Sequence, residues 1–129
     1  MVKKFRVWCV SKQEYEKEKT VITPDGRIFR KYILDGVWRD DSHNHLVEFY
    51  TGWNDENGVE IYEGDRARCG DYIGTICFGT YYTSGGTVYY GWYYKIDGNE
   101  YQKWREDLLY WLNVNPNKFE VIGNIHEVE

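Results

Sequence analysis

The segment DDSHNH at residues 40–45 combines residue types that can bind a divalent metal. Imidazole nitrogen and carboxylate oxygen suit zinc or manganese, so the candidates for a metal site are His43, His45 and Asp41. The chain offers one further imidazole, that of His126, to complete the set. Because Asp, Ser and Asn are also common in turns, we favour a polar connection here and expect neither a metal nor another cofactor.

Carboxylates at two places could supply the acid/base pair that hydrolytic chemistry requires. Glu63 and Asp65 lie in an expected turn, where carboxylates stabilise the backbone. Glu106 and Asp107 fall at the start of an expected helix, where they have the same role. Cys69 follows an arginine, which could activate a thiol, but cysteines in strands are more often small core residues. We therefore predict that the protein is not an enzyme and has no catalytic residues.

Aromatic side chains form the third candidate site. They make up 19% of the chain, and 13 of them are Tyr and 6 are Trp. They are densest in TVYYGWYYK at residues 87–95, an expected strand with rings on both faces. The candidates for a protein interface are Tyr89, Tyr90, Trp92 and Tyr93. Such a strand is either buried on both faces or covered by a partner. We favour core packing or contact between copies of the chain, then a different protein partner, and place stacked nucleic-acid bases third.

Charge is distributed unevenly along the chain, whose formal net charge is −5. Residues 1–31 carry nine Lys and Arg against four Asp and Glu, whereas residues 32–129 carry seven against seventeen. An acidic body repels phosphate, so nucleic acid would have to bind the N-terminal region. The candidate contacts there are Arg27, Arg30 and Lys31, on and beside an expected hairpin. A simpler interpretation is that the basic and acidic parts attract each other in the folded chain.

The number and spacing of the cysteines indicate the cellular compartment of the protein. Cys9, Cys69 and Cys77 are odd in number and lack the spacing of a metal or redox motif. With no signal peptide recognisable, we expect reduced thiols and a cytoplasmic location. No apolar run approaches the ~18 residues of a membrane helix, so we expect no membrane association.

A scaffold of short strands must position these candidates, because aromatic and β-branched residues alternate between closely spaced turn signals. Residues 50–68 contain two turns, at Asn57-Gly58 and Glu63-Gly64-Asp65, which set the strand register on both sides. We interpret this stretch as a corner of the scaffold. Strands are expected at residues 3–10, 21–22, 28–34, 45–50, 59–62, 66–69, 72–78, 87–95 and 118–127.

A helical pattern is confined to residues 105–113. We therefore predict an all-β fold, a small multi-stranded and partly open β-barrel, SH3-like in character, with one short C-terminal helix. At 129 residues the chain is expected to form a single domain, 1–129, with a basic region at 1–34 and an acidic barrel body at 35–129.

Three segments resemble the YopX family, which is found in phages and prophages of Gram-positive bacteria. KFRVW at residues 4–8 is similar to the family's opening KFRAW. YTGWNDENGVEIYEGD at residues 50–65 is similar to its TGLKDKNGKEIYEGD signature, and EVIGNIHE at residues 120–127 to its closing EVIGNIYE. The sequence departs from the family at Trp53, where Leu is usual, and at His126, where Tyr is frequent. The resemblance implies a small β-barrel domain of unassigned function, and it supplies no catalytic residues.

The sequence therefore predicts a binding module that acts through protein–protein contacts in the cytoplasm of a bacterial host. We expect it to form a homo-oligomer and to contact a host or phage protein. The alternative is a nucleic-acid-binding accessory protein that uses the basic N-terminal region.

Overall fold

The computed structural model describes residues 4–17, 19–32, 34–83, 85–99 and 105–127. The chain is β-rich, and every strand pairing in these residues is antiparallel. It divides into two compact units, Met1–Phe49 (unit 1) and Tyr50–Glu129 (unit 2). The expectation that the chain forms a single domain stays a prediction. Within the described ranges, no helix is long and apolar enough to span a membrane.

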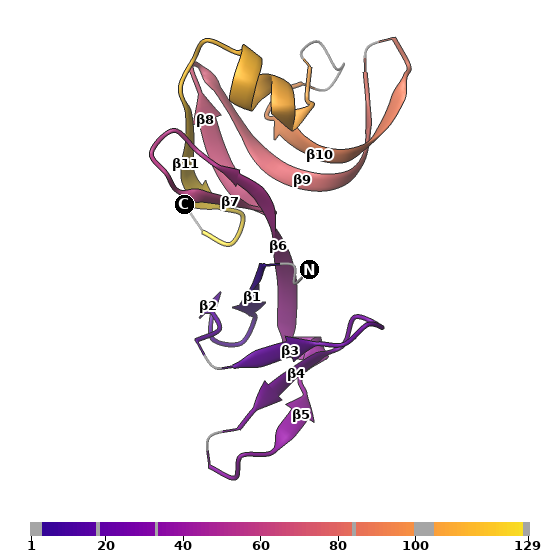
Figure 1. Cartoon of the computed structure of the whole chain (residues 1–129), viewed down its shortest axis with the longest axis vertical. Coiled ribbons are helices and arrows are strands. Elements are labelled where there is room, and N and C mark those ends of the chain that lie inside the picture. Colours follow the sequence, from indigo (N-terminus) through magenta and orange to yellow (C-terminus); the bar gives the residue numbers. More distant parts are fainter. Residues whose placement is uncertain (1–3, 18, 33, 84, 100–104, 128–129) are drawn as a thin grey trace. The chain divides into compact units, whose positions relative to one another are not determined.

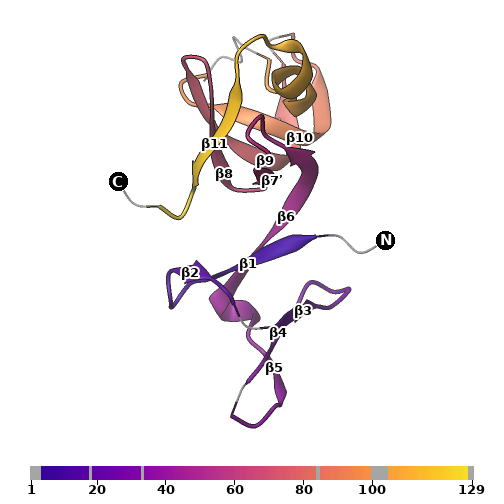
Figure 2. The same ribbon diagram turned by 60° about the vertical axis from the view of Figure 1, so that its left-hand side comes forward.

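Unit 1 contains two antiparallel sheets (Figure 2). The first is formed by β1 (Phe5–Cys9), β2 (Glu14–Tyr15) and β6 (His45–Asn54), with β1 in the middle and β6 continuing past Phe49 into unit 2. The second is formed by β3 (Thr20–Ile22), β4 (Ile28–Lys31) and β5 (Trp38–Asp40), and the short 3-10 helix η1 (Ser42–Asn44) precedes β6. The hairpin expected beside Arg27 is confirmed, because β3 and β4 pair across the turn at Pro24-Asp25-Gly26.

The interior of unit 1 holds polar as well as apolar side chains. Val7, Trp8 and Ile28 are buried there. Glu48 is buried beside them, and its carboxylate accepts hydrogen bonds from Arg6 Nε and from the Tyr15 hydroxyl, each at 2.8 Å. Buried carboxylates need such partners because transfer out of water is costly.

Unit 2 is built around a four-stranded antiparallel sheet in the order β10-β9-β8-β11, which curves into a half-barrel (Figure 1). Its strands are β8 (Asp65–Cys69), β9 (Tyr72–Tyr82), β10 (Val88–Ile96) and β11 (Phe119–Asn124). A further strand, β7 (Glu60–Tyr62), pairs with the end of β6. The β-rich prediction is thus confirmed, whereas the SH3-like character is not.

The helical turns of unit 2 differ from the α-helix expected at residues 105–113. The last turns form a π-helix, η2 (Tyr110–Val114), which ends where Asn115 N donates to Tyr110 O at 2.9 Å. The helical pattern of residues 105–113 rests on Leu108, Leu109 and Leu112, and these three side chains do not all face inward. Leu108 and Trp111 are buried, whereas Leu109 is half exposed. The indole of Trp111 donates to Arg105 O at 2.7 Å, and this bond holds the ring in the core.

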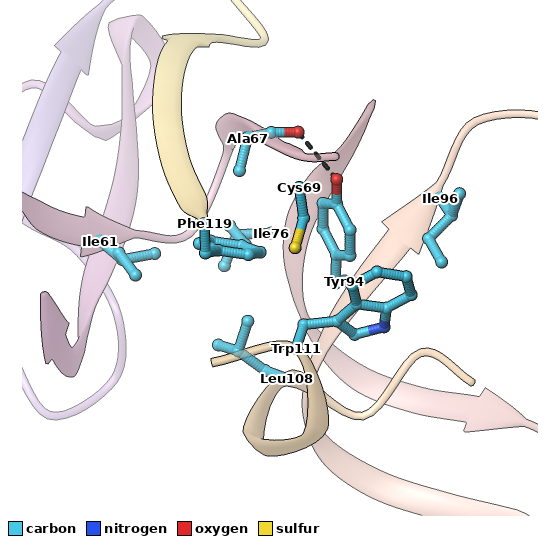
Figure 3. Packing of buried hydrophobic residues seen from close by; sticks show 9 residues of the cluster. All are labelled: Ile61, Ala67, Cys69, Ile76, Tyr94, Ile96, Leu108, Trp111 and Phe119. Carbon is cyan, nitrogen blue, oxygen red and sulfur yellow. Dashed lines mark hydrogen bonds between the residues drawn. The ribbon is translucent and has the colours of Figure 1, made fainter. Parts of the chain in front are cut away.

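The core of unit 2 lies between the concave face of the half-barrel and these helical turns (Figure 3). Tyr94 is completely buried in this core, and its ring contacts Trp111 and Phe119 with centroids 5.2 Å apart in both pairs. The remaining buried members of this cluster are Ile61, Ala67, Cys69, Ile76, Ile96 and Leu108. Edge-to-face packing of this kind adds to the stabilisation from apolar burial.

The double turn at residues 50–68 is a structural corner, as predicted. Asp55 is buried, and one of its carboxylate oxygens accepts the backbone N–H groups of Asn57 and Val59, both at 2.9 Å. The other oxygen accepts the N–H of Val121, in β11, at 2.8 Å. Asp65 is also buried and accepts the N–H of Tyr62 at 2.8 Å. These carboxylates therefore hold backbone in place.

β9 and β10 each contain a glycine with positive φ. Gly79 and Gly91 lie directly opposite each other, with φ of +147° and +151°. An added Cβ would meet no atom within 4 Å at either position, so the backbone conformation itself is what requires glycine.

Replacing Gly91 with alanine is expected to lower the free energy of unfolding by about 1–3 kcal/mol, the usual cost of a glycine-only conformation. Denaturant titration monitored by tryptophan fluorescence would measure it. Gly85→Ala is the control: its φ lies outside the left-handed region and its nearest neighbour is 4.0 Å away. Equal stability of the two variants would contradict the role given to the glycine pair.

Candidate binding site

A cavity of about 510 Å³ opens on unit 2 beside the curved ends of β9 and β10. Its aromatic lining consists of Trp53, Tyr81, Tyr82, Tyr89, Tyr90 and Trp92, and residues 105–109 form the opposite wall. We call this cavity the aromatic pocket. Three of the four interface candidates line it, and the fourth, Tyr93, stacks on Tyr81.

The register of β9 and β10 positions the rings. Tyr89 lies opposite Tyr81, and these rings stack with centroids 5.6 Å apart. Tyr81 also stacks on Tyr93, with ring centroids 5.0 Å apart. Gly91, which lies between Tyr89 and Tyr93 in β10, has no side chain to separate them, so the three rings form a continuous layer. Phe78 contacts Tyr90 and Trp92 edge to face, at 5.3 and 4.8 Å. The rings support one another, which limits the rotamer freedom that binding would otherwise remove.

Several of these rings face solvent. Tyr90 is 75% exposed, Tyr82 54% and Tyr89 48%, whereas Trp92 is only partly buried against the core. The sequence left open whether the strand at residues 87–95 belongs to the core or to an interface. In the structure, burial differs along this strand. Tyr94 is core, and the Tyr89–Tyr90 end is surface.

Charged groups lie on the wall opposite the rings. Arg105 donates to both carboxylate oxygens of Asp107, at 3.0 and 2.9 Å, and lies over the ring of Tyr110. The bond to Asp107 raises the pKa of Arg105 above its usual range. Burial raises the pKa of Tyr81. Glu106 accepts the N–H of Tyr94 through its backbone oxygen at 2.7 Å.

The predicted nucleic-acid contacts occupy different environments in unit 1. Arg27 Nε lies 2.9 Å from an Asp25 carboxylate oxygen, and this guanidinium lies over the ring of Phe29. Arg30 is largely buried, with its Nε 3.8 Å from Glu16. Lys31 is exposed at the end of β4. Carboxylates therefore already neutralise part of this basic cluster.

The predicted metal candidates meet around Asp41. Its carboxylate lies 3.9 Å from His43 Nε2 and 3.4 Å from His45 Nδ1. His43 is 84% exposed, while the side chain of His45 is fully buried and its Nδ1 lies 2.8 Å from Asp41 O. His45 Nδ1 is thus already bound to backbone, and its other nitrogen faces Glu16.

The remaining candidates have structural positions. Asp65 accepts a backbone hydrogen bond, and the Glu106 carboxylate accepts the N–H of Ile96 at 3.2 Å. Cys69 lies in the core, where burial, with a smaller effect of Glu56, raises the pKa of its thiol. A raised pKa opposes the activation that a neighbouring arginine could have provided.

Sequence reasoning missed Tyr81 and Tyr82, because the strand expected at residues 72–78 extends to Tyr82. The signal was present: aromatic residues continue up to the turn that begins at Thr83. It also missed Cys9 and Glu16 as neighbours of His45, since they come from segments that only the sheet pairing brings together.

The model of a family described as YopX protein matches residues 4–128, nearly the whole chain. No curated protein matches the chain.

Proposed function

The chain belongs to the YopX family, whose members are phage- or prophage-type proteins of unassigned function, and we propose that it is a binding module for a partner protein. The aromatic pocket takes an extended, basic segment of that partner. The single observation behind this proposal is the set of exposed rings, packed against one another, that line a cavity of about 510 Å³.

Exposed rings of this kind suit a protein partner. Tyr and Trp are the residues in which interface binding energy concentrates, since they bury a large area at a small cost in conformational entropy. A ring that is 75% exposed, such as Tyr90, stands on the surface, whereas small-molecule sites usually enclose their ligand. An extended segment would cover Tyr90 and reach Trp92 behind it.

The charge of unit 2 favours a basic segment. Residues 50–129 carry thirteen Asp and Glu against six Lys and Arg, a net charge of −7. An acidic unit attracts basic ligands and repels phosphate. Lys and Arg side chains also bind well over Tyr and Trp rings. The pocket therefore combines an apolar surface with an attractive field for cations.

Selection from a random peptide library would test the proposal with a defined probe. We expect the selected peptides to be rich in Lys and Arg and to bind the full chain less tightly as salt rises. Tyr90→Ala should weaken binding by about 30-fold, the effect of losing an interface residue worth ~2 kcal/mol. Ile125→Ala is the matched control, because Ile125 is 54% exposed outside the pocket.

Three results would overturn the proposal. The first is no selectable peptide, and the second is equal binding by Tyr90→Ala and Ile125→Ala. The third is that the unmodified chain sediments as a dimer and Tyr90→Ala sediments as a monomer. In that case a second copy of the chain would occupy the aromatic pocket. If the chain instead binds single-stranded DNA at low salt and loses this activity in an Arg27, Arg30 and Lys31 neutralised variant, the nucleic-acid alternative would replace it.

A further inference from the structure

Three potential metal ligands meet inside unit 1. Cys9 lies at the end of β1 directly opposite His45 in β6, and Glu16 follows β2, the other neighbour of β1. All three side chains are almost completely buried. Their ligand atoms lie within 4.8 Å of one another, and His45 Nε2 lies 3.1 Å from Glu16 Oε2.

The hydrogen bonds of His45 leave a place for a cation. Its Nδ1 lies 2.8 Å from the backbone oxygen of Asp41, which can only accept, so Nδ1 carries the donated proton. A neutral imidazole has no second proton, yet Nε2 faces the carboxylate of Glu16, which when ionised also only accepts. Two acceptors at 3.1 Å repel each other unless a proton or a metal ion lies between them.

The sulfur of Cys9 lies among hydrogen-bond donors. Asn44 Nδ2 and Ser11 Oγ each lie 3.5 Å from Sγ. The Asn44 amide orientation is set because its Oδ1 accepts the N–H of Ser11 at 2.9 Å. Asn44 Nδ2 also donates to Ser11 Oγ at 2.8 Å, which leaves the Ser11 hydroxyl proton for the sulfur. Donors around sulfur stabilise a thiolate, the form that binds metals.

We propose that Cys9 Sγ, His45 Nε2 and Glu16 Oε2 bind a zinc ion in unit 1. Tetrahedral zinc with ordinary bond lengths holds its nitrogen and oxygen ligands about 3.4 Å apart, and its sulfur and nitrogen ligands about 3.6 Å apart. The histidine–glutamate pair is already near that spacing, so mainly the sulfur needs to move, by up to about 1.2 Å. Asp41 supplies the second-shell acceptor that orients a zinc-bound histidine.

Two cations border the site and limit its affinity. Lys12 Nζ lies 3.3 Å from Glu16 Oε1, the carboxylate oxygen that is not among the proposed ligands. Arg30 Nε lies 3.8 Å from Oε2 and has no hydrogen-bond partner in the described residues. The carboxylate of Asp41, 3.4 Å from His45 Nδ1, offsets part of their repulsion. Three protein ligands leave a fourth position for water or another small ligand.

Metal titration of the full chain tests the proposal. We expect one zinc ion per chain by elemental analysis. Cobalt should produce a near-ultraviolet thiolate-to-cobalt band with the visible bands of a tetrahedral ion. Cys9→Ser should lose the band, and its affinity for zinc should fall at least about 100-fold, since even second-shell losses cost 10–100-fold. Cys69→Ser is the matched control, a second buried cysteine in the other unit.

The histidines provide a second matched pair. His45→Ala should abolish zinc binding, whereas His43→Ala, two residues away and exposed, should leave it unchanged. If Cys9→Ser does not fold, the Cys69→Ser/Cys77→Ser variant decides, because Cys9 is then the only cysteine left to produce the cobalt band. Absence of zinc and of the band in the unmodified chain, or their persistence in Cys9→Ser, would overturn the proposal.

Discussion

Replacement of Tyr94 with alanine is expected to lower the free energy of unfolding by about 4 kcal/mol, as for other large aromatic residues deleted from a core. Tyr94 is completely buried, and its ring contacts both Trp111 and Phe119 (Figure 3). Its hydroxyl lies 2.9 Å from Ala67 O and 3.1 Å from Tyr72 O. Burial raises the pKa of this phenol, which keeps it protonated as a donor. Denaturant titration monitored by tryptophan fluorescence measures the loss.

Two further variants separate the causes of this loss. Tyr94→Phe keeps the ring but removes the donor, and we expect it to cost about 1–2 kcal/mol because buried carbonyl groups lose a partner. Tyr90→Ala, in the same strand but exposed, should change stability by no more than about 0.5 kcal/mol. If Tyr94→Ala proved no more destabilising than Tyr90→Ala, the position assigned to the core would be wrong.

The contrast between Tyr90 and Tyr94 shows how far the sequence could predict the site. Alternation places both residues on one face of the strand, together with Trp92, and it separates them correctly from Tyr89 and Tyr93. The alternation of side chains between the two faces does not predict at which residue of the strand the core ends. That depends on which residues pack against each ring: Tyr94 contacts Trp111 and Phe119, whereas Tyr90 contacts Phe78.

The zinc ligands that we propose show a second limit of sequence reasoning. The sequence suggested a metal set within one segment, with His43 and His45 as neighbours. In a strand or short turn, neighbouring side chains point in different directions, and the structure exposes one of these histidines while burying the other. The residues that face His45, Cys9 and Glu16, are distant in sequence and are brought close by the pairing of β1 with β6 and β2.

The central turns were more predictable because their residues act locally. Asn57-Gly58 has few conformational alternatives, and β6 and β7 pair across it, whereas β7 and β8, on either side of Glu63-Gly64-Asp65, pair with strands of different sheets. The helix at residues 105–113 was less predictable, since a stripe of leucines does not specify whether the turns close as α or π. In the π-helix that forms, the buried residue is Trp111, whose indole donates to Arg105 O.

Replacement of Asp55 with alanine is expected to lower the free energy of unfolding by at least about 3 kcal/mol, because three backbone N–H groups lose their acceptor and each buried loss costs ~1–3 kcal/mol. Two of these groups, those of Asn57 and Val59, belong to the turn itself. The third belongs to Val121 in β11, which is distant in sequence. One carboxylate therefore joins the central signature to the closing one, and thermal or denaturant unfolding of the full chain would measure its contribution.

Asparagine at position 55 distinguishes a carboxylate requirement from a general need for a polar side chain. Its carbonyl oxygen can replace the acceptor for Asn57 and Val59, but its amide group would then turn its own donors toward the N–H of Val121. We expect Asp55→Asn to be nearly as destabilising as alanine, whereas Asp71→Ala, an exposed carboxylate in another turn of unit 2, should have little effect. Wild-type stability of Asp55→Asn would show that the bond to β11 contributes nothing. Loss of stability in Asp55→Asn would establish that the bond to Val121 in β11 contributes to folding.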